Sequence, residues 1–373
     1  FNAWFEMVSA FTTTGATLYD TPGRLPDSVH LWRGLVGWLG GFFVLVAATG
    51  ILASQHLGGF ELYAPRAIGR VRLEPGQTGP TTDPAVRLLR HALTLLPVYA
   101  GLTGLVWLAL LLAGDPGLVA LMHAMAALST SGITPLPHLA DAPSGFLGEA
   151  IIGLALVFAL TRRLMPGAAR IETEAPLWRD PELRVGLSFL VAVPVALFLR
   201  HWIGAIEGQL TSDLVQAVQA LWGALFTVLS FLTTTGFESA GWVDARAWSG
   251  MDAPWRILLG LAMMGGGVAT TAGGVKLLRI YALYKLGIRE MDRLSEPSSV
   301  GGGGPAARQM RGEGAFIAFV FFMLFALALG VVNLLLALFG ISFERAVVLS
   351  VSALTTTAPM ASASRPGATS WAT

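Results

Sequence analysis

Four short stretches rich in hydroxyl groups interrupt a chain that is more than half apolar. They read FTTTGAT from Phe11, LSTSGIT from Leu128, LTTTGFE from Leu232 and LTTTAPM from Leu354. Hydroxyls and backbone carbonyls are neutral oxygen ligands, and a ring of such oxygens can replace the hydration shell of a monovalent cation. Glycine follows the hydroxyls in three stretches, where it allows consecutive carbonyls to point to one side without a Cβ clash. Four copies therefore predict four parts of one ion-binding site.

The predicted site takes three consecutive residues from each stretch: the second and third hydroxyl residues and the residue that follows them. These residues are Thr13, Thr14, Gly15, Thr130, Ser131, Gly132, Thr234, Thr235, Gly236, Thr356, Thr357 and Ala358. We expect their carbonyl and hydroxyl oxygens to line the site.

The composition of the chain indicates a membrane protein. Apolar residues make up 54% of it, charged residues 13%, and the mean hydropathy is +0.65. About 20 helical residues cross a hydrocarbon core of about 30 Å. Long uncharged stretches cover residues 34–60, 91–114, 185–199, 257–275 and 314–343. The stretch at 185–199 is short, so its helix should include Arg184 and Arg200 as interfacial ends. The predicted fold class is an all-α integral membrane protein, and the absence of cysteine excludes disulfides and thiolate metal sites.

Basic residues indicate the sidedness of the chain. Most of the lysines and arginines lie in residues 61–90, 162–184 and 276–313. Such loops stay on the cytoplasmic side of a membrane. The hydroxyl stretches lie between these loops, so we expect them on the outer side.

The order of segments predicts a unit that repeats four times: apolar helix, short helix, hydroxyl turn, second apolar helix and basic loop. The stretches recur at intervals of more than a hundred residues, which indicates repeated domains rather than a solenoid of short units. The predicted repeats are residues 1–87, 88–182, 183–313 and 314–373. The first lacks its entering helix and the fourth its exit helix, so we expect the chain to be a fragment.

Membrane physics connects this unit to ion passage. A helix that turns back partway through a bilayer exposes backbone, which is tolerated only where protein or a water-filled cavity surrounds it. Four such turns around one axis could form that cavity. Each short helix also directs its negative C-terminal end towards the axis, which favours a cation.

This combination of features resembles the superfamily of K+ transporters that comprises the TrkH- and TrkG-type proteins, the Ktr membrane subunits and the plant HKT proteins. The resemblance covers nearly the whole chain. It implies K+ uptake through a selectivity filter, with K+ bound by the twelve site residues and no organic cofactor in this chain. It also implies a homodimer in the bacterial inner membrane and a cytosolic, nucleotide-binding regulatory subunit of the TrkA type.

A glycine-rich segment strengthens the resemblance. The segment GGGVATTAGGVKLLR, residues 265–279, resembles the interruption that TrkH-type proteins place in the third exit helix, where it acts as an intramembrane gate. The implied gate residues are Gly265, Gly266, Gly267, Thr270, Thr271, Gly273 and Gly274. Five glycines would each cost an ordinary helix about 1 kcal/mol. We therefore expect an interrupted helix.

Ala358 departs from the family pattern, which has glycine at this position. If the position needs a left-handed backbone, alanine costs roughly 1 to 2 kcal/mol there. One of four carbonyls would then be lost or misdirected. Our hypothesis is a reduced preference for K+ over Na+.

Simpler or different interpretations apply to several residues. Gly34, Gly37, Gly40 and Gly41 suit close helix packing. Asp115 and Asp213 suit helix caps. His123 and His138 suit packing rather than metal binding. Glu6 suits a position that faces the outer vestibule or a local partner. Glu238 could attract cations at the outer mouth or be an ordinary interfacial charge.

Two other functions compete with ion conduction. One is a non-conducting membrane scaffold that keeps the repeats without their activity. The other is an intramembrane hydrolase that uses Ser129 or Ser131 with a histidine base. Against the hydrolase, no copy carries a matching histidine and a single active site would not explain four copies.

Overall fold

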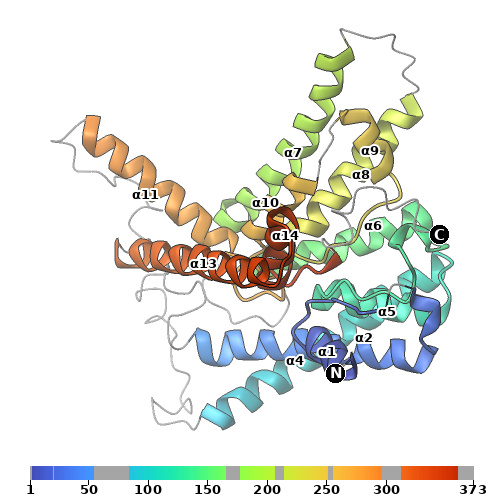
Figure 1. Cartoon of the computed structure of the whole chain (residues 1–373). Helices are drawn as coiled ribbons and strands as arrows, with labels where there is room; N and C mark the ends of the chain where they lie inside the picture. The colour runs from blue at the N-terminus through green and yellow to red at the C-terminus, as the bar shows by residue number, and fades with distance from the viewer. Residues whose placement is uncertain are drawn as a thin grey trace.

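The computed structural model describes residues 2–19, 21–53, 84–164, 177–205, 214–250, 255–295 and 312–359. These residues form helices joined by turns, and no strand occurs among them (Figure 1). The predicted all-α fold class is confirmed. Asp213 and most of the basic loops lie outside the described residues.

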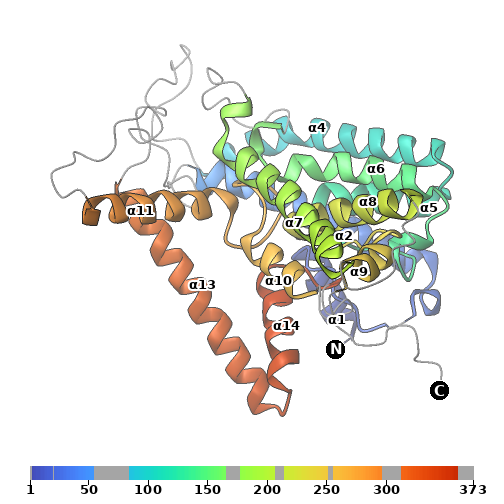
Figure 2. The same cartoon turned by 90° about the horizontal axis from the view of Figure 1, so that it is seen from above.

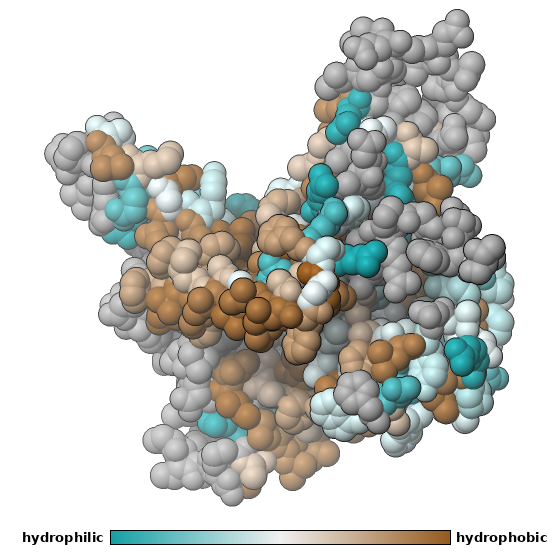
Figure 3. Space-filling view, in the orientation of Figure 1, coloured by the Kyte–Doolittle hydropathy of each residue, from teal (hydrophilic) through white to brown (hydrophobic). Residues whose placement is uncertain are grey.

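Within these described residues, four helices are long and apolar enough to cross a membrane. They are α2 (Asp27–Ala47, continued by the π-helical turn η2, Ala48–Leu52), α4 (Pro84–Leu112), α7 (Pro181–Ala205) and α13 (Gly312–Leu338). As expected, α7 extends past both Arg184 and Arg200. Phe316, Leu327 and Leu338 on α13 are more than 60% exposed. Figure 3 shows α13 as a mostly hydrophobic rod on the molecular surface, as lipid contact requires.

Four shorter helices lead into the hydroxyl stretches, and we call them the pore helices. They are α1 (Asn2–Phe11), α5 (Gly117–Ser129), α8 (Leu214–Leu232) and α14 (Phe343–Leu354). Each ends at or just before the first hydroxyl residue of its stretch. The helix bounds therefore follow the change from apolar to hydroxyl side chains in the sequence.

Each exit helix follows its hydroxyl stretch and packs in a recurring way. These helices are α2, α6 (Gly145–Leu156, extended by the 3-10 turn η5, Val157–Ala159) and α10 (Trp255–Met264). Each contacts its own pore helix and also the next one along the chain, in the pairs α2 with α5, α6 with α8 and α10 with α14. Figures 1 and 2 show the resulting arrangement, in which α13 and α14 form a hairpin beside the main bundle.

Glycines on α2 permit this close approach. A Cβ added to Gly40 would lie 1.9 Å from the carbonyl oxygen of Phe11, and one added to Gly41 would lie 2.7 Å from the Cβ of Ser129. Gly34 and Gly37 likewise face α5 and the residues beside it. The packing interpretation of these four glycines is confirmed, because two pore helices lie directly against them.

The third exit helix is interrupted, as the glycines predict. Helix α10 ends at Met264 and α11 (Leu277–Ser295) begins thirteen residues later, so residues 265–276 form a loop. Helix α11 packs against α7 and α13. The other described elements are α9 (Trp242–Ser249) and the 3-10 turns η1 (Pro22–Arg24), η4 (Leu139–Asp141), η6 (Arg162–Leu164) and η7 (Leu177–Arg179).

Candidate functional site

The first and third hydroxyl residues of every stretch are hydrogen-bonded in the same way. The first hydroxyl donates to the carbonyl four residues earlier at 2.8 or 2.9 Å, in Thr12, Ser129, Thr233 and Thr355. It also lies 2.9 to 3.2 Å from the third hydroxyl, in the pairs Thr12 with Thr14, Ser129 with Ser131, Thr233 with Thr235 and Thr355 with Thr357. A hydroxyl can donate and accept, so the first and third side chains bond to each other as well as to the helix. These two side chains therefore fasten the stretch to its pore helix.

The second hydroxyl residue of every stretch adopts a left-handed backbone. The φ angles are +56° at Thr13, +51° at Thr130, +58° at Thr234 and +56° at Thr356. The next amide then reaches back to the carbonyl five residues earlier, as Thr14 does to Ser9 at 2.9 Å and Thr357 to Ser352 at 2.9 Å. This is the Schellman ending of a helix, in which glycine usually takes the left-handed position. A β-branched residue there costs about 1 to 2 kcal/mol, and such strain concentrates at functional sites.

The four stretches lie beside one another in chain order. A Cβ on Gly15 would be 2.1 Å from the carbonyl oxygen of Ser131, and a Cβ on Gly132 would be 2.1 Å from that of Thr235. A Cβ on Gly236 would be 2.9 Å from Pro359, and the amide of Ala358 donates to the carbonyl of Thr14 at 3.0 Å. The first stretch therefore touches the second, the second the third, the third the fourth and the fourth the first. All twelve predicted site residues belong to this ring.

The fourth stretch differs from the others after its third hydroxyl. Gly15, Gly132 and Gly236 have φ angles of +72°, +63° and +82°, whereas Ala358 does not adopt a left-handed conformation. The condition for strain at Ala358 is therefore not met, because the chain leaves the shared conformation at this residue. Its amide instead donates a hydrogen bond to the carbonyl oxygen of Thr14.

The loop at residues 265–276 lies directly against the beginnings of these stretches, where the pore helices end. The amide of Gly273 donates to Thr234 Oγ1 at 2.7 Å, and a Cβ on Gly273 would be 2.2 Å from the carbonyl oxygen of Thr355. The hydroxyl of Thr271 donates to the carbonyl of Leu128 at 3.3 Å. The loop thus contacts three of the four stretches or their pore helices.

The remaining predicted gate residues fold the loop and hold its other side. Gly265 and Gly274 are left-handed and pack against each other, and the hydroxyl of Thr270 donates to the carbonyl of Gly267 at 2.7 Å. Gly266 and Gly267 lie against Ala159 and Leu160, where a Cβ would be 2.6 and 2.5 Å from a carbonyl oxygen. The amide of Val268 donates to Glu182 Oε1 at 2.8 Å. The loop is therefore clamped between the ring, the C-terminal end of α6 and the N-terminal end of α7.

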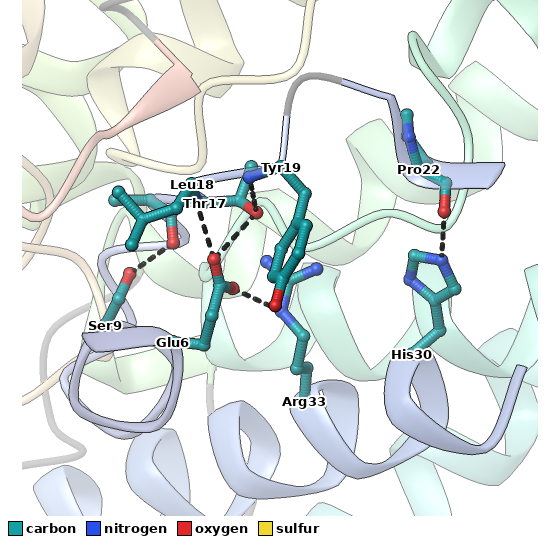
Figure 4. A network of polar contacts seen from close by, with 9 residues as sticks. Glu6, Ser9, Thr17, Leu18, Tyr19, Pro22, His30 and Arg33 are labelled. Carbon is teal, nitrogen blue, oxygen red and sulfur yellow. Dashed lines mark hydrogen bonds and ion pairs between the residues drawn. The ribbon is translucent and has the colours of Figure 1, made fainter. Parts of the chain in front are cut away.

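Buried polar side chains hold the chain just outside the ring, and sequence reasoning missed this role. Glu6 Oε1 accepts from the hydroxyl of Thr17 at 2.9 Å and from the amide of Leu18 at 2.7 Å, while Oε2 lies 2.8 Å from Arg33 Nε (Figure 4). Both side chains of this ion pair are less than 10% exposed. Glu6 thus has local partners, which was one of its two predicted environments.

The second and third stretches have comparable contacts. His123 Nε2 is 2.9 Å from Thr134 Oγ1, and its Nδ1 is 3.9 Å from Asp115 Oδ2. Glu149 on α6 accepts from Trp222 Nε1, the hydroxyl of Ser239 and the amide of Ala240 at 2.7 to 2.8 Å.

Asp115 does not cap α5, contrary to our expectation. The N-cap of this helix is Pro116, and Asp115 Oδ1 instead accepts from the amide of Ser144 at 2.9 Å. Burial by itself would raise the pKa of Asp115, but the neighbouring His123 and the hydrogen bonding from Ser144 prevail and lower it. Asp115 therefore stays ionised beside a buried histidine.

Glu238, which follows the third stretch, lies in a different environment. Burial raises the pKa of its carboxyl, while the charges of Arg246 and His138 partly oppose this. Its proton is therefore released at a higher pH than that of an ordinary glutamate.

The ring offers neutral oxygens. Among the described residues, no group of three His, Cys, Asp or Glu side chains is arranged to hold a metal ion. The first and third hydroxyls are bonded to each other within each stretch, so the other neutral oxygens of the ring are its backbone carbonyls and the hydroxyls of its middle threonines. Carbonyl rings suit monovalent cations.

Comparisons with known proteins agree with this architecture. Residues 151–358 match the family TrkH, described as a cation transport protein. The Trk system potassium uptake protein TrkH of Halomonas elongata is 33% identical over 306 residues, which cover 80% of this chain and 58% of that protein. The Trk system potassium uptake protein TrkI of the same organism is 30% identical over 373 residues, which cover 96% of this chain and 68% of that protein.

A solved structure shares the fold. The crystal structure of the potassium transporter TrkH from Vibrio parahaemolyticus superimposes with a TM-score of 0.72 at 24% identity, over 95% of this chain and 69% of that chain. The chain spans a little over half the length of the TrkH relatives that it matches. With a family match over more than half of its length and the relatives described above, the chain belongs to the TrkH family of cation transport proteins.

Proposed function

We propose that this protein takes up K+ across the plasma membrane through a selectivity filter formed by the ring of four hydroxyl stretches. The observation that carries the proposal is the repeated geometry of the ring: the same Schellman ending, the same left-handed threonine and the same hydroxyl pair recur in all four stretches. A structural role at one helix end would not require four strained endings to meet at one place.

The physical basis is ion dehydration by neutral oxygens. An ion in the filter exchanges its hydration shell for carbonyl oxygens, and the C-terminal ends of four pore helices favour positive charge there. A negative potential inside the cell then drives K+ inward. We assign ion binding to Thr13, Thr14, Gly15, Thr130, Ser131, Gly132, Thr234, Thr235, Gly236, Thr356, Thr357 and Ala358.

The gate and the repeat boundaries are part of the same proposal. The clamped loop contacts three of the four stretches or their pore helices, which supports a gate role for its seven glycine and threonine residues. We propose repeats at residues 1–87, 88–182, 183–313 and 314–373, with the filters on the outer side of a bacterial inner membrane. Family resemblance further supports a homodimer and a TrkA-like, nucleotide-binding regulatory subunit.

One observation favours a second candidate, the non-conducting scaffold. The hydrogen bond from Ala358 to the Thr14 carbonyl occupies an oxygen of the ring. The intramembrane hydrolase has no such support: Ser131 is bonded to Ser129, the His123 nitrogens face Thr134 and Asp115, and the relatives are named as transporters.

Ion flux in reconstituted vesicles separates uptake from the scaffold. The protein that contains this chain is purified, placed in liposomes and tested for K+ and Na+ flux under an imposed inside-negative potential, with protein-free liposomes as the control. We expect K+ flux that exceeds Na+ flux. It should be reduced by Gly15→Ala, which brings a Cβ to 2.1 Å from the Ser131 carbonyl, and not by Gly101→Ala, which has open space around it. A wild-type protein that is folded and transports no K+ would support the scaffold instead.

A further inference from the structure

One position, shared by three of the four pore helices, carries contacts that hold the outer end of three filters. Glu6, His123 and Thr227 each lie nine residues before the filter glycine of their own stretch. All three side chains are at most 3% exposed, within helices that are otherwise mainly apolar. Buried polar groups are costly unless they are hydrogen-bonded.

Each of the three side chains reaches the same part of its own stretch. Glu6 accepts from Leu18, the third residue after the glycine, and Thr227 Oγ1 accepts from the amide of Ser239, also the third residue after the glycine, at 3.3 Å. His123 is bonded to Thr134, the second residue after its glycine, as Glu6 is to Thr17. Three different side chains thus make equivalent contacts (Figure 4 shows those of Glu6).

These contacts complete the restraint on the filter. The Schellman ending fixes its inner end to the pore helix, as in the bond from Thr235 to the Ser230 carbonyl at 2.9 Å. The side chain at the shared register fixes its outer end to the same helix. Only a few residues lie between these two anchors, so the carbonyls between them cannot shift far in response to a smaller ion. Ligating groups discriminate best when such surrounding contacts hold them in place.

We propose, on the basis of the function proposed above, that Glu6, His123 and Thr227 are positioning residues that set the cation selectivity of three filters. The fourth pore helix has Leu349 at this register, a side chain that neither donates nor accepts a hydrogen bond. The fourth stretch is also the one in which the residue after the hydroxyls is not left-handed. The fourth filter therefore lacks this side-chain anchor, and the other three supply most of the selectivity.

Thr227→Val tests the proposal with the smallest change, because it replaces one hydroxyl by a methyl group of similar size. Thr227→Ser keeps the oxygen and serves as the conservative rescue. Thr94→Val in α4 is the matched control, since Thr94 is exposed and bonds only to the carbonyl of Arg90. All are made in the full-length protein in liposomes, and the ratio of K+ to Na+ flux and the thermal unfolding midpoint are measured.

We expect Thr227→Val to lower the ratio of K+ to Na+ flux by about fivefold or more, because it leaves the buried Ser239 amide without this acceptor. Thr227→Ser should restore the ratio and Thr94→Val should leave it at the wild-type value. An unchanged ratio in a folded Thr227→Val protein overturns the inference. A wild-type protein without K+ flux would instead refute the proposed function, so the two failures can be told apart.

A second variant covers the case in which Thr227→Val does not fold. Removing Glu6 alone would leave Arg33 buried without its partner, which is strongly destabilising. The double variant Glu6→Met with Arg33→Met removes both charges together. We expect it to fold and to lose selectivity by a similar factor, whereas wild-type selectivity in this variant would contradict the role of Glu6.

Discussion

Gly132→Ala separates the two reasons why glycine is needed in the filter. The first reason is the backbone, because a φ of +63° costs alanine about 1 to 2 kcal/mol. The second is space, because the new Cβ would lie 2.1 Å from the carbonyl oxygen of Thr235 in the neighbouring filter. To reach an ordinary contact of 3.4 Å, this distance must widen by 1.3 Å. The displaced oxygen belongs to the proposed site.

The structure provides a control for the backbone effect alone. Gly250 has a φ of +57°, close to that of Gly132, and has no atom within 4 Å of an added Cβ. Gly250→Ala and Gly132→Ala should therefore lose a similar backbone contribution of about 1 to 2 kcal/mol to the free energy of unfolding. Only Gly132→Ala should alter ion discrimination, since a shift of about 1 Å in a positioned group can reduce its effect tenfold or more.

Fluxes of K+ and Na+ in liposomes, measured beside the unfolding midpoint, decide the matter. We expect the ratio of K+ to Na+ flux to fall about tenfold in Gly132→Ala and to stay unchanged in Gly250→Ala. The reasoning is refuted if Gly132→Ala retains the wild-type ratio, or if Gly250→Ala changes it equally.

Three further changes test other parts of the ring. Gly273→Ala places a Cβ 2.2 Å from the carbonyl oxygen of Thr355, so it should push the loop away from the filter and raise the basal K+ flux. Gly260→Ala in α10 is the control, because its Cβ meets no atom within 4 Å and should leave the flux unchanged. Equal fluxes in the two variants would count against the gate. Ala358→Gly should allow the left-handed conformation of the other three stretches, release the Thr14 carbonyl and raise the ratio of K+ to Na+ flux; an unchanged ratio would show that the fourth stretch does not limit selectivity. Because the pKa of Glu238 is raised by burial, its negative charge is present above that pKa and is lost on acidification earlier than that of an ordinary glutamate. If Glu238 attracts cations at the outer mouth, K+ flux should decline as the external pH falls through this raised pKa, and Glu238→Gln should remove that decline. An identical pH profile in the wild type and in Glu238→Gln would exclude the role.

The helices and the glycine break were predictable because each depends on local composition. The expected short helix of the second repeat occurs as α5, Gly117–Ser129, and its run of apolar residues ends at the hydroxyl residue Ser129. The break after Met264 follows from the five glycines among residues 265–274, which an unbroken helix does not tolerate.

Two features of the site could not be predicted because they depend on tertiary contacts. Nothing in the letters TTT indicates that the second threonine is left-handed, since this conformation is rare for β-branched residues in general. The shared position of Glu6, His123 and Thr227, nine residues before the glycine, was also not recognised, because the three side chains differ in type and each alone suited an ordinary interpretation. A usable signal was present: a buried polar residue nine positions before the filter glycine in three apolar helices.

The hydrogen bonds also explain why the second stretch can read STS where the others read TTT. Ser129 and Ser131 make the same two bonds as the threonines, to the carbonyl one turn back and to each other, because these bonds need only the hydroxyl. The middle residue is threonine in all four stretches, and it is the one with the left-handed backbone. The first and third positions therefore require a hydroxyl group that ties the stretch to its helix, and they leave the backbone carbonyls for the proposed ion site. Serine should replace threonine at these positions at little cost, whereas valine, which has the shape of threonine without its proton or lone pairs, should release the filter.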